Sequence, residues 1–188
     1  MERGLVLSLA FCSQLALAAE IAGVTVEERV KLGAAELRLN GAGIRTRIVF
    51  KVYVGALYLP EKKSAAAEVL ALKGAKRVSM TMLRDLTANQ LTDALMDGIR
   101  ANHSESELAA LKGRVDALAA LMREIGSAKE KTVITLDFLP DAGTQVTVNG
   151  AARGKPIPGE DFYGALLKIW LGDRPVDADL KKAMLGGA

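Results

Sequence analysis

Cysteine and histidine are nearly absent from this chain of 188 residues, which holds one of each. The single cysteine, Cys12, lies in an apolar N-terminal stretch, so residues 19–188 contain no thiol and can form no disulfide. The lone histidine, His103, has no partner at a metal-binding spacing, and we expect it at the surface or capping a helix. The sequence therefore predicts no metal site and no cofactor, and a domain stabilised by burial of its core alone.

Motifs for several common functions are missing as well. The chain has no phosphate-binding glycine loop, no CxxC pair and no Ser-His-Asp grouping. Its net charge is only +3, its aromatic content is 4%, and its lysines and arginines are scattered, so nucleic-acid binding is not expected. Outside the N-terminus no apolar run approaches the ~20 residues of a membrane span, and we expect no integral membrane protein.

The N-terminal 18 residues have the pattern of a secretory signal peptide. Arg3 supplies the positive charge, an apolar stretch runs from residue 5 to residue 17, and small residues at Ala16 and Ala18 suit cleavage after Ala18. We therefore expect residues 1–18 to be removed and residues 19–188 to form one domain. A bacterial periplasmic location is the corresponding expectation, and the oligomeric state stays open.

The remaining pattern alternates between strand and helix signals. Strands are predicted at 21–30, 37–39, 44–59, 77–83, 131–139 and 144–149, and helices at 64–72, 87–102, 104–125, 162–171 and after Pro175. An Asn-Gly pair at 40–41 predicts a hairpin turn before the strand at 44–59, and Thr87 and Ser104 are predicted helix caps. Strands at both ends and helices in the middle indicate an α+β fold, with helices layered on an antiparallel sheet.

The segment 44–59 is the most informative part of the chain. If it is one strand, Arg45, Arg47, Lys51 and Tyr53 share one face, and mostly apolar residues share the other. A sheet with that pattern packs a core on one side and offers an anion-binding cluster on the other.

The same segment carries a resemblance to a known family. The chain contains GIR at 43–45 and FKVYVGALYL at 50–59, then MTMLRDLT at 80–87, then FYGALLKIWLG at 162–172 with PVD at 175–177. In this order the blocks resemble the bacterial branch of the chalcone isomerase-like superfamily, over roughly residues 20–186. The resemblance implies an open-faced β-sandwich: a large antiparallel sheet under a layer of helices, with a ligand cleft between them.

The superfamily includes chalcone-cyclising enzymes, fatty-acid-binding members and non-catalytic helpers. The enzymes use an arginine in the Gly-x-Arg turn, which corresponds to Arg45, together with several polar groups on the strand and helices. By the resemblance, those other positions are Tyr53, Leu91, Gly98 and the Ile169-Trp170 stretch. Leu91 and Ile169 cannot donate a hydrogen bond to a developing enolate, so chalcone isomerase activity is not expected.

The fatty-acid-binding members hold a carboxylate with an arginine and a tyrosine, which suggests a different function here. We expect a non-catalytic protein that binds a small amphipathic, lipid-like acid through Arg45 and Tyr53. The apolar wall would be formed by Leu91, Ile169 and Trp170. A guanidinium offers a bidentate fork, and the phenol adds a third donor.

Two alternatives stay open, an isomerase or lyase that uses Arg45 on another unsaturated carbonyl compound, and an interaction module without a small ligand. Arg45 could also simply pair with Asp137 or Glu27, and Tyr53 could direct its hydroxyl to solvent.

Overall fold

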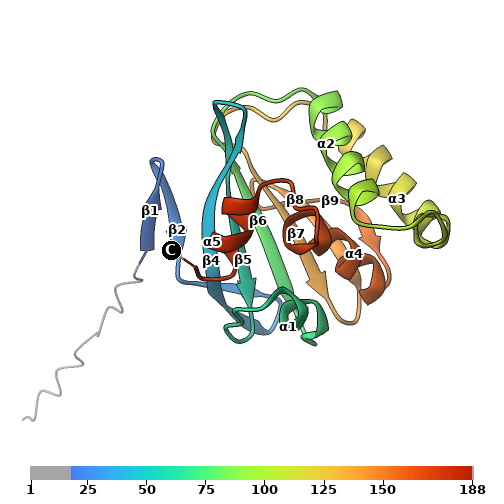
Figure 1. The fold of residues 1–188 in the computed structure, drawn as a ribbon, viewed down its shortest axis with the longest axis horizontal. Coiled ribbons are helices and arrows are strands. Elements are labelled where there is room, and N and C mark those ends of the chain that lie inside the picture. The colour runs from blue at the N-terminus through green and yellow to red at the C-terminus, as the bar shows by residue number, and fades with distance from the viewer. Residues whose placement is uncertain (1–17, 188) are drawn as a thin grey trace, which may run out of the picture.

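A sheet of seven antiparallel strands forms the centre of the protein (Figure 1). The computed structural model describes residues 18–187. The strands are β3 (Arg29–Leu32), β4 (Ala35–Arg47), β5 (Phe50–Leu59), β6 (Lys76–Met82), β7 (Val133–Leu139), β8 (Gly143–Val148) and β9 (Ala151–Ile157). Each strand pairs with the next one along the chain, so the order in the sheet follows the sequence. A separate hairpin of β1 (Ala18–Ile21) and β2 (Val24–Glu27) precedes the sheet.

Five helices complete the fold: α1 (Ala66–Ala71), α2 (Ala88–Ala101), α3 (Glu105–Ile125), α4 (Glu160–Leu171) and α5 (Ala178–Met184). The predicted caps of the two longest helices are confirmed. Thr87 and Ser104 each form a capping box, in which the cap side chain and the side chain three residues later bond to each other's backbone N–H.

The two faces of the sheet bury different cores. Helices α2, α3 and α4 lie over one face and enclose the larger core, which includes Leu57, Ile134, Leu166 and Trp170. A smaller core on the other face joins Val54, Ala56 and Tyr58 of β5 to the β1–β2 hairpin and β3. The predicted α+β class, a large antiparallel sheet under a layer of helices, is confirmed.

The predicted hairpin turn at residues 40–43 is wrong, because β4 runs through it. Gly41 and Gly43 lie where α5 packs closely against the strand: a Cβ at Gly41 would overlap the carbonyl oxygen of Ala183, and one at Gly43 would lie 2.6 Å from the Ala183 Cβ. Asn40 is buried, and its amide donates to the carbonyl oxygens of Met184 and Lys63. The glycines therefore permit close packing of a helix and do not make a turn.

The predicted single strand at 44–59 is also wrong, because a turn occurs where the sequence predicted a continuous strand. The chain reverses at Ile48-Val49, and Arg47 of β4 pairs with Phe50 of β5. The turn lacks the residues typical of hairpins, and Ile48 adopts a φ of +59° with 88% of its surface exposed. A β-branched residue at positive φ is strained, which is why residue type did not predict the turn.

Other differences are smaller. The predicted strand at 21–30 is divided among β1, β2 and β3, and β9 was not predicted. Helix α1 begins at Ala66 and not at residue 64, and the last helix begins at Ala178 with Asp177 as its cap. Residues 1–17 lie outside the described part of the chain, so the signal peptide stays a prediction. Within residues 18–187, no helix has the length and apolar character needed to cross a membrane.

Replacing Ile48 with asparagine is expected to raise the free energy of unfolding by about 1 kcal/mol. Asparagine tolerates positive φ, whereas isoleucine there carries strain of roughly 1–3 kcal/mol. Denaturant unfolding measures the change. Val49→Asn is the matched control, because Val49 is also exposed but does not have positive φ. Equal effects of the two substitutions would contradict strain at position 48.

Candidate ligand-binding site

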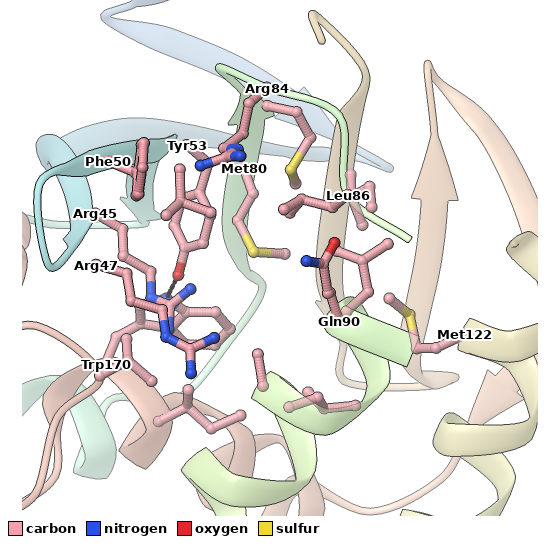
Figure 2. Close-up of a pocket in the computed structure, with 18 of the residues that line it drawn as sticks. Arg45, Arg47, Phe50, Tyr53, Met80, Arg84, Leu86, Gln90, Met122 and Trp170 are labelled. Atoms are coloured by element: carbon pink, nitrogen blue, oxygen red, sulfur yellow. Dashed lines mark hydrogen bonds between the residues drawn. The ribbon is translucent and has the colours of Figure 1, made fainter. Parts of the chain in front are cut away.

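A cavity of about 300 Å³ lies between the helix-covered face of the sheet and helices α2, α3 and α4 (Figure 2). Figure 2 shows Arg45, Arg47, Tyr53 and Trp170 gathered on one side of it, and Met122 on the other. Away from this polar side the lining is mostly apolar; it includes Met80, Met82, Leu95, Leu118, Met122, Ile134 and Leu136. The cavity therefore has a cationic, hydrogen-bonding end and an apolar end.

All five residues predicted to bind a ligand line this cavity: Arg45, Tyr53, Leu91, Ile169 and Trp170. Arg45 and Tyr53 are not eight residues apart on one strand, as expected, but are directly opposed on β4 and β5. Opposed residues in an antiparallel pair share a face, so the predicted proximity arises through a different path. Val52 forms a bulge in β5 beside Tyr53. Because of this bulge, the side chains of Val52 and Tyr53, although adjacent in sequence, both line the cavity. Their role in binding stays a prediction.

The Tyr53 hydroxyl is held by Trp170. The indole Nε1–H donates to the Tyr53 oxygen at 2.8 Å, and both side chains are buried. The indole can only donate, so the phenol is the acceptor and its own hydrogen remains to be donated. None of the hydrogen bonds found within residues 18–187 uses that hydrogen. The alternative in which Tyr53 directs its hydroxyl to solvent is therefore wrong.

Burial keeps this phenol neutral. Desolvation raises the pKa of Tyr53 to about 12, although the nearby charge of Arg45 and the bond from Trp170 act in the opposite direction. At neutral pH Tyr53 is therefore a neutral phenol whose hydroxyl hydrogen is available to be donated to a ligand at the polar end of the cavity.

Arg45 lies beside this phenol, with its guanidinium carbon 5.7 Å from the centre of the Tyr53 ring. Its Nε is buried and has no hydrogen-bond partner, and no carboxylate of the described chain comes within 4.0 Å of the group. The alternative that Arg45 pairs with Asp137 is wrong. Asp137 instead accepts two hydrogen bonds from Arg77, at 2.6 and 2.7 Å.

Three further polar residues line the cavity. Arg47, placed by the sequence on the same strand face as Arg45 and Tyr53, is exposed and also lines the cavity. Sequence reasoning missed Arg84, whose guanidinium carbon lies 4.8 Å from the centre of the Phe50 ring, and Gln90 on α2. A charged residue directly after the alternating strand at 77–83 was the available signal for Arg84.

Comparison with known proteins identifies the family of this chain and a solved structure of similar fold. The profile of the chalcone isomerase-like family matches residues 18–186. The chain belongs to the chalcone isomerase-like family. A solved structure with a similar fold is a fatty-acid binding protein of Arabidopsis thaliana: the TM-score is 0.66 at 13% identity, over 90% of this chain and 96% of that one. Comparison with curated protein sequences yields no significant match.

This member of the chalcone isomerase-like family has an apolar contact where the resemblance places polar groups of the enzymes. Gly98 of α2 is buried against Ile169 of α4, and a Cβ at Gly98 would lie 2.7 Å from the Ile169 Cγ2. The Ile169 side chain thus occupies the space that a side chain at position 98 would need. An asparagine at position 98 would require Ile169 to move.

Substituting Gly98 by asparagine is accordingly expected to lower the free energy of unfolding by about 2 kcal/mol, through overpacking against Ile169. Thermal or denaturant unfolding measures the loss. Gly113→Asn in α3 is the control, because a Cβ at Gly113 would meet nothing within 4 Å. Gly98→Asn should cost less in an Ile169→Ala background than in the wild-type background, and a stable single variant would contradict the shared-space account.

Proposed function

We propose that this protein binds a small amphipathic carboxylate, such as a fatty acid, without transforming it. One observation carries the proposal: Arg45 has no ion pair within the described chain and stands beside the free hydroxyl hydrogen of Tyr53, at one end of an apolar cavity. A partly buried cation without a partner gains free energy from an incoming anion.

The parts of such a ligand would suit the two ends of the cavity. A carboxylate beside Arg45 could accept from the guanidinium and from the Tyr53 hydroxyl, and charge-assisted hydrogen bonds of this kind are the strong ones. The alkyl chain would lie against Leu91, Ile169 and the Trp170 ring, and extend toward Met122. The volume of about 300 Å³ is at the lower end of the range of about 300–1,000 Å³ for ligand pockets.

The wider comparison supports the same ligand class. The Arabidopsis thaliana protein of similar fold is described as a fatty-acid binding protein. A catalytic alternative would need hydrogen-bond donors around the reacting carbonyl. Leu91 and Ile169 make the cavity wall apolar, and Gly98 behind Ile169 adds no donor, which favours binding over isomerisation. An interaction module without a small ligand would suit a cleft filled by its own side chains, whereas this one has open volume.

Export to the bacterial periplasm is part of the proposal and rests on the N-terminal pattern of residues 1–18. Periplasmic fractionation followed by determination of the mature N-terminus tests it. A mature chain that begins at Ala19 in the periplasmic fraction is the expected result, and an uncleaved chain in the cytoplasmic fraction would contradict it.

Native mass spectrometry of the purified protein tests for a bound acid. Titration with saturated fatty acids of increasing length, each beside the alcohol of the same length, then tests the mode of binding. We expect affinity to rise about fourfold per methylene, from ~0.8 kcal/mol per buried CH₂, until the cavity is full. The alcohols should bind at least tenfold more weakly. Equal affinity for acid and alcohol, or no binding of either, would overturn the proposal.

A further inference from the structure

Three consecutive large apolar side chains are exposed at the tip of the β4–β5 hairpin. Ile48 is 88% exposed, Val49 78% and Phe50 54%, whereas the other large apolar side chains of residues 18–187 are buried or partly buried. Contiguous exposed apolar groups mark interaction sites, whereas single ones need no explanation. The tip of this hairpin is therefore the strongest candidate for an interaction surface.

Cations surround this apolar tip. Arg47 and Lys51 flank it along the chain, and Arg84 reaches it from the end of β6 to lie over Phe50. All three are exposed, and none has a carboxylate within 4.0 Å among the described residues. The surface thus combines apolar side chains with three positive charges that are free to meet anions.

The neighbouring carboxylates are already bonded elsewhere. Asp85, next to Arg84, accepts from the Lys129 ammonium and from the backbone N–H of Glu130. Asp177 accepts from the backbone N–H of Thr46 and caps α5. Neither acid therefore forms an ion pair with the cations of the tip.

The hairpin tip and the cavity are continuous. Arg47, Ile48, Phe50 and Arg84 belong to both, whereas Val49 and Lys51 belong to the tip alone. Any surface that covers the tip would lie at the mouth of the cavity. An isoleucine at the strained position 48 fits a side chain that acts outside the fold, because backbone strain of this kind gathers at functional sites.

We propose that the β4–β5 hairpin tip, residues 47–51 together with Arg84, docks onto an anionic phospholipid surface. Ile48, Val49 and Phe50 enter the interface, and the three cations meet lipid headgroups. Docking places the cavity mouth against the bilayer, so that an acyl ligand passes between the two without crossing water. The passage of ligand rests on the proposed function, whereas the docking stands on the hairpin alone.

A lipid surface suits the tip better than a protein partner does. A stable protein–protein interface buries about 1,200–2,000 Å² in total and needs a broad complementary surface. This tip is a two-residue turn with three apolar side chains, which is convex and narrow. Insertion into a headgroup layer requires only that apolar side chains project and that cations lie behind them, as they do here.

Sedimentation of the full mature protein with vesicles tests the docking. Vesicles of phosphatidylglycerol and phosphatidylcholine are compared with vesicles of phosphatidylcholine alone, at low and high salt. We expect stronger partitioning onto the anionic vesicles, weakened by salt. Val49→Asn with Lys51→Gln should reduce the partition coefficient at least tenfold, since one cation alone accounts for about fivefold. Lys155→Gln, which removes an exposed cation of β9, should change it little.

Fatty-acid titration without vesicles separates docking from binding. The Val49→Asn/Lys51→Gln variant should keep its affinity in solution, because neither residue lines the cavity. Arg45→Ala should lose affinity for the acid and still partition onto anionic vesicles. Equal partitioning of the wild-type protein and the double variant would overturn the docking. So would a dimer or protein complex that depends on Val49 in the absence of vesicle binding.

Discussion

Replacement of Arg45 by alanine is expected to weaken fatty-acid binding about 100-fold, equivalent to ~2.7 kcal/mol, and to leave the fold intact. The expected loss follows from removing one partner of a desolvated, charge-assisted hydrogen-bonded pair. The fold should tolerate the change, because Arg45 forms no ion pair within residues 18–187 and its buried Nε has no partner. The free energy of unfolding should change by no more than about 1 kcal/mol, the scale of its contact with the Tyr53 ring.

Titration calorimetry with a fatty acid, together with denaturant unfolding, measures both quantities. Arg45→Lys keeps the charge but loses the bidentate fork, and an intermediate loss of about tenfold is expected. Arg47→Ala is the matched control at the exposed side of the cavity, where solvent screens the charge, and a loss of only a few-fold is expected. Undiminished affinity of Arg45→Ala would remove Arg45 from the site. A loss confined to Arg47→Ala would move the carboxylate to the cavity mouth.

Alanine at Asp137 is expected to lower the free energy of unfolding by about 3–5 kcal/mol, the largest effect on stability that we anticipate. Asp137 on β7 is 2% exposed and is bonded in bidentate fashion by Arg77, its direct neighbour on β6. Removing the carboxylate leaves a half-buried guanidinium without compensation, which is the costly way to break a buried ion pair. Arginine keeps its charge at any accessible pH, so Arg77 cannot escape the loss by deprotonating.

Thermal and denaturant unfolding of single and double variants tests this pair. Arg77→Met combined with Asp137→Leu should recover most of the loss, since apolar replacement of both partners is often neutral. Arg29→Met, from an exposed pair with Glu36, is the control and should cost less than about 1 kcal/mol. A cost for Asp137→Ala as small as that of the control would mean that the pair is screened by water.

The helices α2 and α3 could be predicted because their signals are local. In each helix the capping residue and its partner lie within one turn, as Thr87 with Gln90 and Ser104 with Glu107. Apolar residues then follow at helical spacing. The strand turn at Ile48-Val49 could not be predicted, because it contradicts local preference. The Asn40-Gly41 pair suggested a turn that does not exist, because its glycine is needed for contact with a helix more than 130 residues later.

The candidate site, too, has features that the sequence determined and features that depend on the tertiary structure. The sequence by itself determined the family, the α+β class and the residue types at the site, since the alternation of cations and apolar residues and the order of the three blocks are properties of the chain. Only the tertiary structure decided which groups are free to act. It paired Asp137 with Arg77, bonded Trp170 to Tyr53 across 117 positions, and left Arg45 without an ion pair within the described chain. Contacts between residues so distant in sequence depend on how strands and helices pack, which local propensity does not encode.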